Sequence, residues 1–373
     1  MASFHKRRAT RKQGQERPAW LLERLPKHYL TPKTQPCKLH ESFAYEVNRA
    51  PNGSSNLALA PYLARRALLT LPVLVIISFG VFLMVDLFPG TQVEAMTGQE
   101  GLAPEQEAQL RHELGLDRSF MVRFIDWAAD AARLELGYSR SVNSSVVDAL
   151  GSRVGPTLQL GLFSLVLAVS IGVPLGVVAA ARRGGVIDHI ATLVAVSGVA
   201  MPSFLMALLF VLFFSVKLGW FPATGYVLVT KDPVDALKYS MLPGLTLALH
   251  LSASIMRHTR SSMLEVLSQD YIRTARAKGL GARIVLVRHA LRNALLPVIT
   301  VVGIQFGVLV AGQVVIEQIF AIPGVGRLFI DAISARDVVL IQGLVLMIAA
   351  GLLAINLVTD VIYGIAEPRM RSF

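Results

Sequence analysis

Charged residues are scarce in this chain. Only 16% of its 373 residues are Asp, Glu, Lys or Arg, whereas 53% are hydrophobic and the mean hydropathy is +0.54. Soluble domains carry roughly 25% charged residues. A water-soluble fold of this length has no core large enough for so many apolar side chains, so the composition predicts an integral membrane protein.

Other features are absent as well. The one cysteine, Cys37, excludes an internal disulfide, and no Gly-x4-Gly-Lys-Ser/Thr loop is present with which the chain could bind and hydrolyse ATP. The eight histidines are scattered, and no His-Glu-x-x-His motif occurs. No cluster of His, Cys and acidic residues falls within an apolar stretch, so we expect no metal site and no intramembrane enzyme.

The apolar residues gather in six stretches that lack Asp, Glu, Lys and Arg. Each stretch is long enough to cross about 30 Å of hydrocarbon as a helix, and in lipid only helices or closed barrels satisfy the backbone. The sequence therefore predicts an all-α polytopic membrane protein with six transmembrane helices. The stretches are Ala67 to Val85, Val154 to Ala181, Ile190 to Val216, Tyr239 to Met256, Asn293 to Ile316 and Val338 to Thr359.

Six spans place both termini on one side of the membrane. That side then holds 25 of the 36 Lys and Arg residues, so the positive-inside bias predicts that the termini are cytoplasmic. We divide the chain into a tail at 1–62, a first transmembrane helix at 63–88, an extracytoplasmic helical region at 89–153 and a core at 154–373. The core contains the other five spans and a basic cytoplasmic loop at 257–296.

The tail at 1–62 is polar, basic and rich in proline, and we expect it to be disordered. A lipid-binding or partner-binding arm, or an over-extended start, are the alternatives.

The extracytoplasmic region contains two helical patterns. Pro104 to Asp117 begins with proline and has glutamate in its first turn, as helices commonly do. The next segment places five apolar residues on one helical face: Phe120, Phe124, Trp127, Ala131 and Leu134. This amphipathic helix would lie on the membrane, cover a pore mouth or form a docking surface, or it would only pack on the bundle.

Proline occurs in several spans, at Pro72, Pro174 and Pro202, and bent helices can enclose a cavity. The bends suggest a translocation path lined by Met201, Pro202, Phe204, Gln305 and Phe306. Polar residues within the spans are few, and Glu317 lies close to a span end, where an ionised group costs less. The lack of a chain of buried carboxylates argues against an ion-coupled secondary carrier.

The loop at 257–296 interrupts this apolar pattern with a basic helical pair. Gly279 and Gly281 predict a turn between a first helix and a second helix from Ala282 to Leu296. We expect the second to present Ile284, Val287, Leu291 and Leu295 on one face. In the first, small residues (Thr274, Ala275, Ala277) stand beside Arg273, Arg276 and Lys278, which fits insertion into a groove of another protein. Binding to anionic lipid is the alternative, whereas nucleic acid is not expected because no aromatic residues are interleaved.

The loop resembles the cytoplasmic "EAA" loop of ABC-importer permeases, in particular the oligopeptide/dipeptide/nickel transport permease family. "DYIRTARAKGL" and "RHALRNALLP" carry the resemblance, with Gly279 on the motif glycine. "YLARRALLTLPVLVIISFGVFLMVDLFPG", "VVIEQIFAIPGVGRL" and "NLVTDVIYGIAEPRMR" extend it over most of the chain beyond residue 60. The chain departs from the family pattern at Thr91 and Gln92, at Glu135 and at Glu367, and the tail has no counterpart.

The resemblance implies a bacterial inner-membrane importer built from several subunits. The partners would be a second, homologous permease subunit, two cytoplasmic ATPases that bind ATP and Mg, an extracytoplasmic solute-binding protein and membrane lipid. This chain would hold no cofactor itself. Its coupling helix, seated in an ATPase cleft, would comprise Tyr271, Arg273, Thr274, Ala275, Arg276, Lys278 and Gly279. Peptides are the expected cargo, and nickel, a sugar or an antimicrobial peptide are alternatives. A membrane scaffold without transport is the remaining rival.

Overall fold

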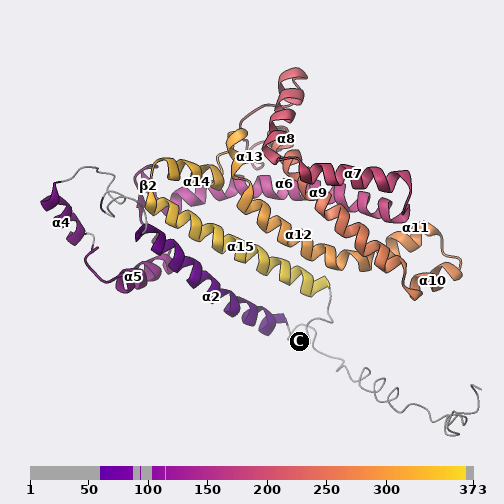
Figure 1. Ribbon diagram of the computed structural model, residues 1–373, viewed down its shortest axis with the longest axis horizontal. Helices are drawn as coiled ribbons and strands as arrows, with labels where there is room; N and C mark the ends of the chain where they lie inside the picture. Colours follow the sequence, from indigo (N-terminus) through magenta and orange to yellow (C-terminus); the bar gives the residue numbers. More distant parts are fainter. Residues whose placement is uncertain (1–58, 87–92, 94–102, 114, 367–373) are drawn as a thin grey trace, which may run out of the picture. The chain divides into compact units, whose positions relative to one another are not determined.

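The computed structural model describes residues 59–86, 93, 103–113 and 115–366 (Figure 1). The tail predicted at 1–62 lies almost wholly outside the described residues. The described part is mainly helical, and its elements are α2 (Leu59–Asp86), α4 (Pro104–Glu113), α5 (Phe120–Ala132), β1 (Tyr138–Ser139), β2 (Ser144–Ser145), α6 (Val146–Ala181), α7 (Val186–Ala200), α8 (Ser203–Phe210), the π-helix η3 (Val211–Lys217), α9 (Pro233–Leu267), α10 (Asp270–Ala277), α11 (Ala282–Ile284), the π-helix η4 (Val285–Leu291), α12 (Arg292–Gly312), α13 (Val314–Ile319), α14 (Val325–Ser334) and α15 (Val338–Ala366).

Long apolar helices form where the sequence predicts spans. Three helices among the described residues are long and apolar enough to cross a bilayer: Val146–Ala181, Ala282–Gly312 and Val338–Ile362. The first predicted stretch lies in α2, and the fourth lies in α9, which is 35 residues long but less apolar because it carries serines, threonines and His250. The helical, polytopic class is therefore confirmed, and the number of six spans stays a prediction.

The third predicted stretch is not one straight helix. It consists of α7 and of α8 continued by η3, and the two parts meet at an angle of 101°. The break follows from Pro202, because a proline disfavours the α conformation in the residue before it. Met201 accordingly has φ −83° and ψ 127°, which is extended backbone.

Close packing of α6 on α9 depends on two glycines of the "GVPLG" segment. A Cβ atom on Gly172 would lie 2.8 Å from the carbonyl oxygen of Ser252, and one on Gly176 would lie 2.7 Å from Cβ of Thr259. Small residues four apart let two membrane helices approach closely. The two glycines of this segment are thus as important to the fold as its proline, Pro174.

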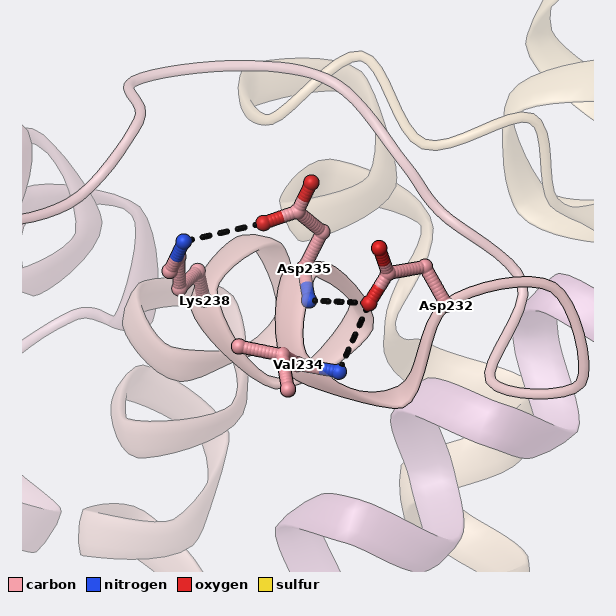
Figure 2. A network of polar contacts seen from close by, with 4 residues as sticks. All are labelled: Asp232, Val234, Asp235 and Lys238. Carbon is pink, nitrogen blue, oxygen red and sulfur yellow. Dashed lines mark hydrogen bonds and ion pairs between the residues drawn. The ribbon is translucent and has the colours of Figure 1, made fainter.

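The start of α9 is fixed by its first turn (Figure 2). One carboxylate oxygen of Asp232 accepts hydrogen bonds from the amides of Val234 at 2.9 Å and Asp235 at 3.0 Å, and Pro233 occupies the first helical position. Lys238 pairs with Asp235 at 2.9 Å on the exposed side. An acidic cap followed by proline is a strong helix-start combination.

The amphipathic helix α5 packs on the first span. The rings of Phe120, Phe124 and Trp127 in α5 pack against those of Phe79 and Phe82 in α2. The distances between ring centroids are 5.3 to 5.7 Å. The interpretation of α5 as a helix that packs on the bundle is thus supported. Inclusion of Leu134 on its apolar face was wrong, because α5 ends at Ala132 and Leu134 has φ 63°.

Beyond α5, a two-residue antiparallel hairpin pairs β1 with β2 and leads into α6. Ser145 caps α6 by accepting a hydrogen bond from the Asp148 amide at 3.1 Å, so the helix begins eight residues before the predicted start at Val154. Asp337 ties the hairpin to α15, since its carboxylate accepts hydrogen bonds from the hydroxyls of Ser139 at 2.7 Å and Ser141 at 2.8 Å.

Asp337 also caps α15, because it accepts a hydrogen bond from the Leu340 amide at 3.0 Å. Burial by itself would raise the pKa of Asp337, but the hydrogen bonds from Ser139, the Leu340 amide and Ser141 outweigh burial and hold the pKa below its ordinary value. The carboxylate is therefore charged in the folded chain at neutral pH.

Glu317 in α13 is fully buried, which differs from the expectation for a residue at a span end. Its carboxylate accepts hydrogen bonds from Thr157 Oγ1 at 2.7 Å and from the Arg327 amide at 3.0 Å. Thr157 in turn accepts a hydrogen bond from the Val325 amide at 2.8 Å. Glu317 and Thr157 thus satisfy amides in the first turn of α14, where a helix favours negative charge. Burial raises the pKa of Glu317, and these hydrogen bonds oppose the rise.

Candidate functional site

The predicted coupling helix exists as α10, and most of its residues face outwards. Tyr271, Arg273, Thr274, Arg276 and Lys278 are all exposed. Arg273 pairs with Asp270 of its own first turn, at 3.4 Å. The helix therefore presents a basic surface with small side chains, on which another protein can pack closely.

Two residues on the opposite face anchor α10. Ile272 has 0% and Ala275 has 6% of its surface exposed. They belong to one apolar cluster with Val177 and Ala180 of α6, Met263 of α9, Val285 and Ala290 of η4, and Ala294 of α12. Ala275, predicted to contact a partner, faces this cluster instead. The helix α10 is consequently attached to the ends of α6, α9 and α12 together.

Gly279 ends α10 in the left-handed conformation, with φ +79°. Its amide donates to the Arg276 carbonyl at 2.9 Å, which closes the last turn. A Cβ atom at Gly279 would meet no atom within 4 Å, so the backbone conformation and not space within this chain requires glycine here.

The second predicted helix is not a separate short helix. From Ala282 the chain runs continuously through η4 into α12, as one helix of 31 residues. The buried residues in the first half of this helix are Val285, Ala290, Ala294 and Val298, in which the first step is five residues and the others are four. The five-residue step is the π turn.

The first half of the predicted apolar face is not buried within this chain. Ile284 and Val287 are 49% and 52% exposed. The extra residue of the π turn shifts the register, and a search for helical spacing of 3.6 residues cannot detect it.

Three polar contacts reinforce the attachment of the loop. Asn293 Nδ2 donates to the hydroxyl of Tyr271 at 2.8 Å, and Ser262 Oγ donates to the Ala294 carbonyl at 2.9 Å. Arg260 of α9 forms a bidentate pair with Asp188 of α7, at 2.6 Å and 2.8 Å. The partners Arg260 and Asp188 are 72 residues apart, so no local pattern predicted their pairing. Together the contacts make these ends of α7, α9 and α12 and the helix α10 one connected unit.

The five predicted path residues fall into two groups. Met201, Pro202 and Phe204 lie at the break between α7 and α8, where Pro202 and Phe204 are exposed. Gln305 and Phe306 lie on α12 and are half-buried. Gln305 Nε2 donates to Ser254 Oγ at 2.8 Å. A Cβ atom on Gly161 of α6 would lie 3.3 Å from the Phe306 ring.

A further candidate for the path is His250, which lies in the middle of α9 and is exposed. Arg257 and His258 follow it at seven and eight residues, on the same helical face, and both are exposed as well. Ionisable side chains in a span are costly in lipid and face a bundle interior or a water-filled cavity.

A metal centre finds no support in the described part of the chain, where no group of three or more His, Cys, Asp and Glu residues could hold an ion.

Two family profiles and several known proteins match this chain. Residues 172–372 match the profile of the binding-protein-dependent transport system inner membrane component, and residues 59–161 match the profile of its N-terminal part. A peptide transport system permease protein of Brucella abortus (strain 2308) is 42% identical over 307 residues, which cover 82% of this chain and 98% of the relative.

Two further comparisons concern another relative and a solved structure. The dipeptide transport system permease protein DppB of Escherichia coli (strain K12) is 38% identical over 333 residues, which cover 83% of this chain and 98% of the relative. A chain of the MetNI methionine ABC transporter, in a structure of its inward-facing conformations, aligns with 59% of this chain and 96% of its own length, at 17% identity and a TM-score of 0.49. From the two profile matches and the identity to full-length relatives, the chain belongs to the family of binding-protein-dependent transport system inner-membrane components.

Proposed function

We propose that this chain is a permease subunit of an ATP-driven importer, with di- or oligopeptides as its cargo. The observation that carries the proposal is α10: an exposed basic helix, anchored through Ile272 and Ala275 to the ends of three membrane helices. Such a helix passes a push or pull to the spans as a unit. Peptide cargo is supported by the relatives, whose names refer to peptide and dipeptide transport.

On this proposal two cytoplasmic ATPases bind ATP and Mg and drive the cycle. An ATPase cleft receives the outer face of α10, where Tyr271, Arg273, Thr274 and Lys278 are exposed. Arg276, also predicted as a coupling residue, lies at the edge of this face, on the side towards α6 and α11. Ile272 and Ala275 transmit its displacement inwards, and Gly279 sets the turn. When the ATPases close, α9 and α12 move with α10 and the path opens to the other side, a rigid-body transition between two states.

A second permease subunit completes the path, with one wall supplied by α9. His250 is our addition to the predicted path residues, because an exposed histidine in a span has to face water or protein. Its imidazole can accept a hydrogen bond from the backbone of a passing peptide or donate one to it. Met201, Pro202, Phe204, Gln305 and Phe306 remain proposed path residues, and the Gln305 side chain is held by its hydrogen bond to Ser254.

The orientation in the bacterial inner membrane follows from the same argument. If α10 meets an ATPase, the loop at 257–296 and both termini are cytoplasmic, and α5, the hairpin and α14 face outwards. The outward region then receives the solute-binding protein.

Reconstitution tests the function. The chain is incorporated into liposomes with the second permease, the ATPases and the binding protein encoded beside it, and uptake of a labelled dipeptide is measured. The proposal expects uptake only with ATP and binding protein. Uptake driven by an ion gradient in the chain alone would establish a secondary carrier. ATP-dependent uptake of nickel, a sugar or an antimicrobial peptide in place of the dipeptide would support an ATP-driven importer and refute the dipeptide cargo.

A further inference from the structure

A cavity of about 530 Å³ lies behind the coupling helix, and the proposed function does not use it. It is bounded by the end of α6, the end of α9, the last turn of α10 and the first turns of α11 and η4. These elements meet at the end of the long helices where α10 and α11 lie (Figure 1).

Three arginines from three separate elements line this cavity: Arg183, Arg276 and Arg283. All three are exposed, and in the part of the chain that the structure describes no carboxylate pairs with any of them, in contrast to Arg260 with Asp188. The long helix beginning at Ala282 also starts here, without a side-chain cap at Gly281. The rim is therefore cationic, and its fork-shaped donors suit a phosphate.

The floor of the same cavity is apolar. Leu264 and Leu267 of α9, Leu286 of η4 and Ala180 of α6 contribute to it. A free phosphate or a nucleotide would leave these side chains unused, and an acidic protein segment would use only the rim. A ligand that satisfies both surfaces carries a phosphate and a hydrocarbon chain.

We propose that this cavity binds an anionic phospholipid of the cytoplasmic leaflet, with its phosphate at Arg183, Arg276 and Arg283 and an acyl chain along Leu264, Leu267 and Leu286. Its place at the ends of α6 and α9 is on the cytoplasmic side in the orientation proposed above, on which the inference rests. Basic pockets at the cytoplasmic ends of spans are recurrent sites for anionic lipid. Because Arg276 belongs to α10, the bound lipid stabilises the packing of that helix against α6.

Native mass spectrometry of the full chain in detergent tests the site without requiring transport. Phosphatidylglycerol and phosphatidylcholine are titrated into the wild type and into a triple variant, Arg183→Gln, Arg276→Gln and Arg283→Gln. A matched triple variant, Arg257→Gln, Arg288→Gln and Arg292→Gln, removes the same charge from exposed arginines that do not line the cavity. The melting temperature of each variant in detergent checks its folding.

We expect the wild type to prefer phosphatidylglycerol. An arginine near anionic lipid contributes about a factor of five in affinity, so the cavity variant should lose about 100-fold and the matched variant should keep most of the preference. Equal losses in both triple variants, or no preference in the wild type, would overturn the proposal. Uptake can fail for other reasons without affecting this result, so the two proposals are tested separately.

Two further measurements distinguish the lipid from a free phosphate and from a covering ATPase. Glycerol phosphate carries the phosphate without acyl chains and should compete far more weakly than the lipid; equal competition would show a phosphate site only. A photoactivatable phosphatidylglycerol in membranes that contain the assembled transporter should label the segment 264–286. If it labels that segment in the isolated chain but not in the assembly, an ATPase covers the cavity and the lipid assignment is wrong.

Discussion

Replacement of Ile272 by alanine tests how α10 is held. The side chain is completely buried in the cluster with Met263 and Val285, and truncation removes three carbon atoms from it. Burial of a methylene contributes about 0.8 kcal/mol, and the remaining cavity adds to the loss, so we expect about 3 kcal/mol. Only Ile272 and Ala275 of α10 are buried, so the loss falls mainly on the docked position of this helix.

A loss of about 3 kcal/mol lowers the ratio of docked to undocked α10 by about 100-fold. Ile272→Ala should therefore insert normally, show faster amide hydrogen exchange over 270–280, and lose most ATP-dependent uptake. Ile284→Ala is the matched control, because Ile284 lies in the same loop and is 49% exposed. If exchange and uptake in Ile272→Ala equal those of the control, the cluster does not hold the coupling helix and the reasoning fails.

Other substitutions test separate parts of the account. Gly279 has φ +79°, so Gly279→Ala costs about 1 kcal/mol and should lower uptake several-fold. Gly281→Ala should be neutral, because φ is −60° there. Gly279→Trp should abolish uptake while insertion into the membrane is intact, and normal uptake in this variant would contradict a coupling role. In a background without cysteine, His250→Cys should react with a membrane-impermeant thiol reagent. The control Val308→Cys should not react, because Val308 is exposed on the apolar helix α12. Equal reactivity of the two cysteines would remove His250 from the path. Asp337→Asn should unfold at a lower temperature than the wild type at pH 7, as followed by circular dichroism. Since the pKa of Asp337 is lowered in the folded chain, the difference should be complete above about pH 4 and should close as the pH falls through the folded value; a difference independent of pH would contradict it.

The sequence predicted those features that depend on local pattern. Charge-free stretches marked the apolar helices, because lipid excludes unpaired charges over the whole length of a span. The basic residues beside Gly279 marked α10 and its end, because few residues other than glycine adopt the conformation found there. Pro202 marked the break of the third stretch, although not its angle.

Features that depend on distant partners were not predictable in this way. Glu317 is buried because Thr157, 160 residues earlier, and the first turn of α14 supply hydrogen bonds, and nothing in its neighbourhood indicates that contact. The pair of Asp188 with Arg260 is of the same kind. The π turn after Ala282 shifts the buried face by one residue, and a search for a regular helical spacing does not include such a shift.

The central claim is that α10 seats in a subunit that hydrolyses ATP. A photo-crosslinking amino acid in place of Thr274, which is exposed on α10, measures this contact in membranes that contain the whole transporter. The account predicts a crosslink to the ATPase subunit, with a yield that changes when ATP is replaced by ADP. Crosslinks only to lipid or to extracytoplasmic protein, in a preparation that still takes up peptide, would contradict it.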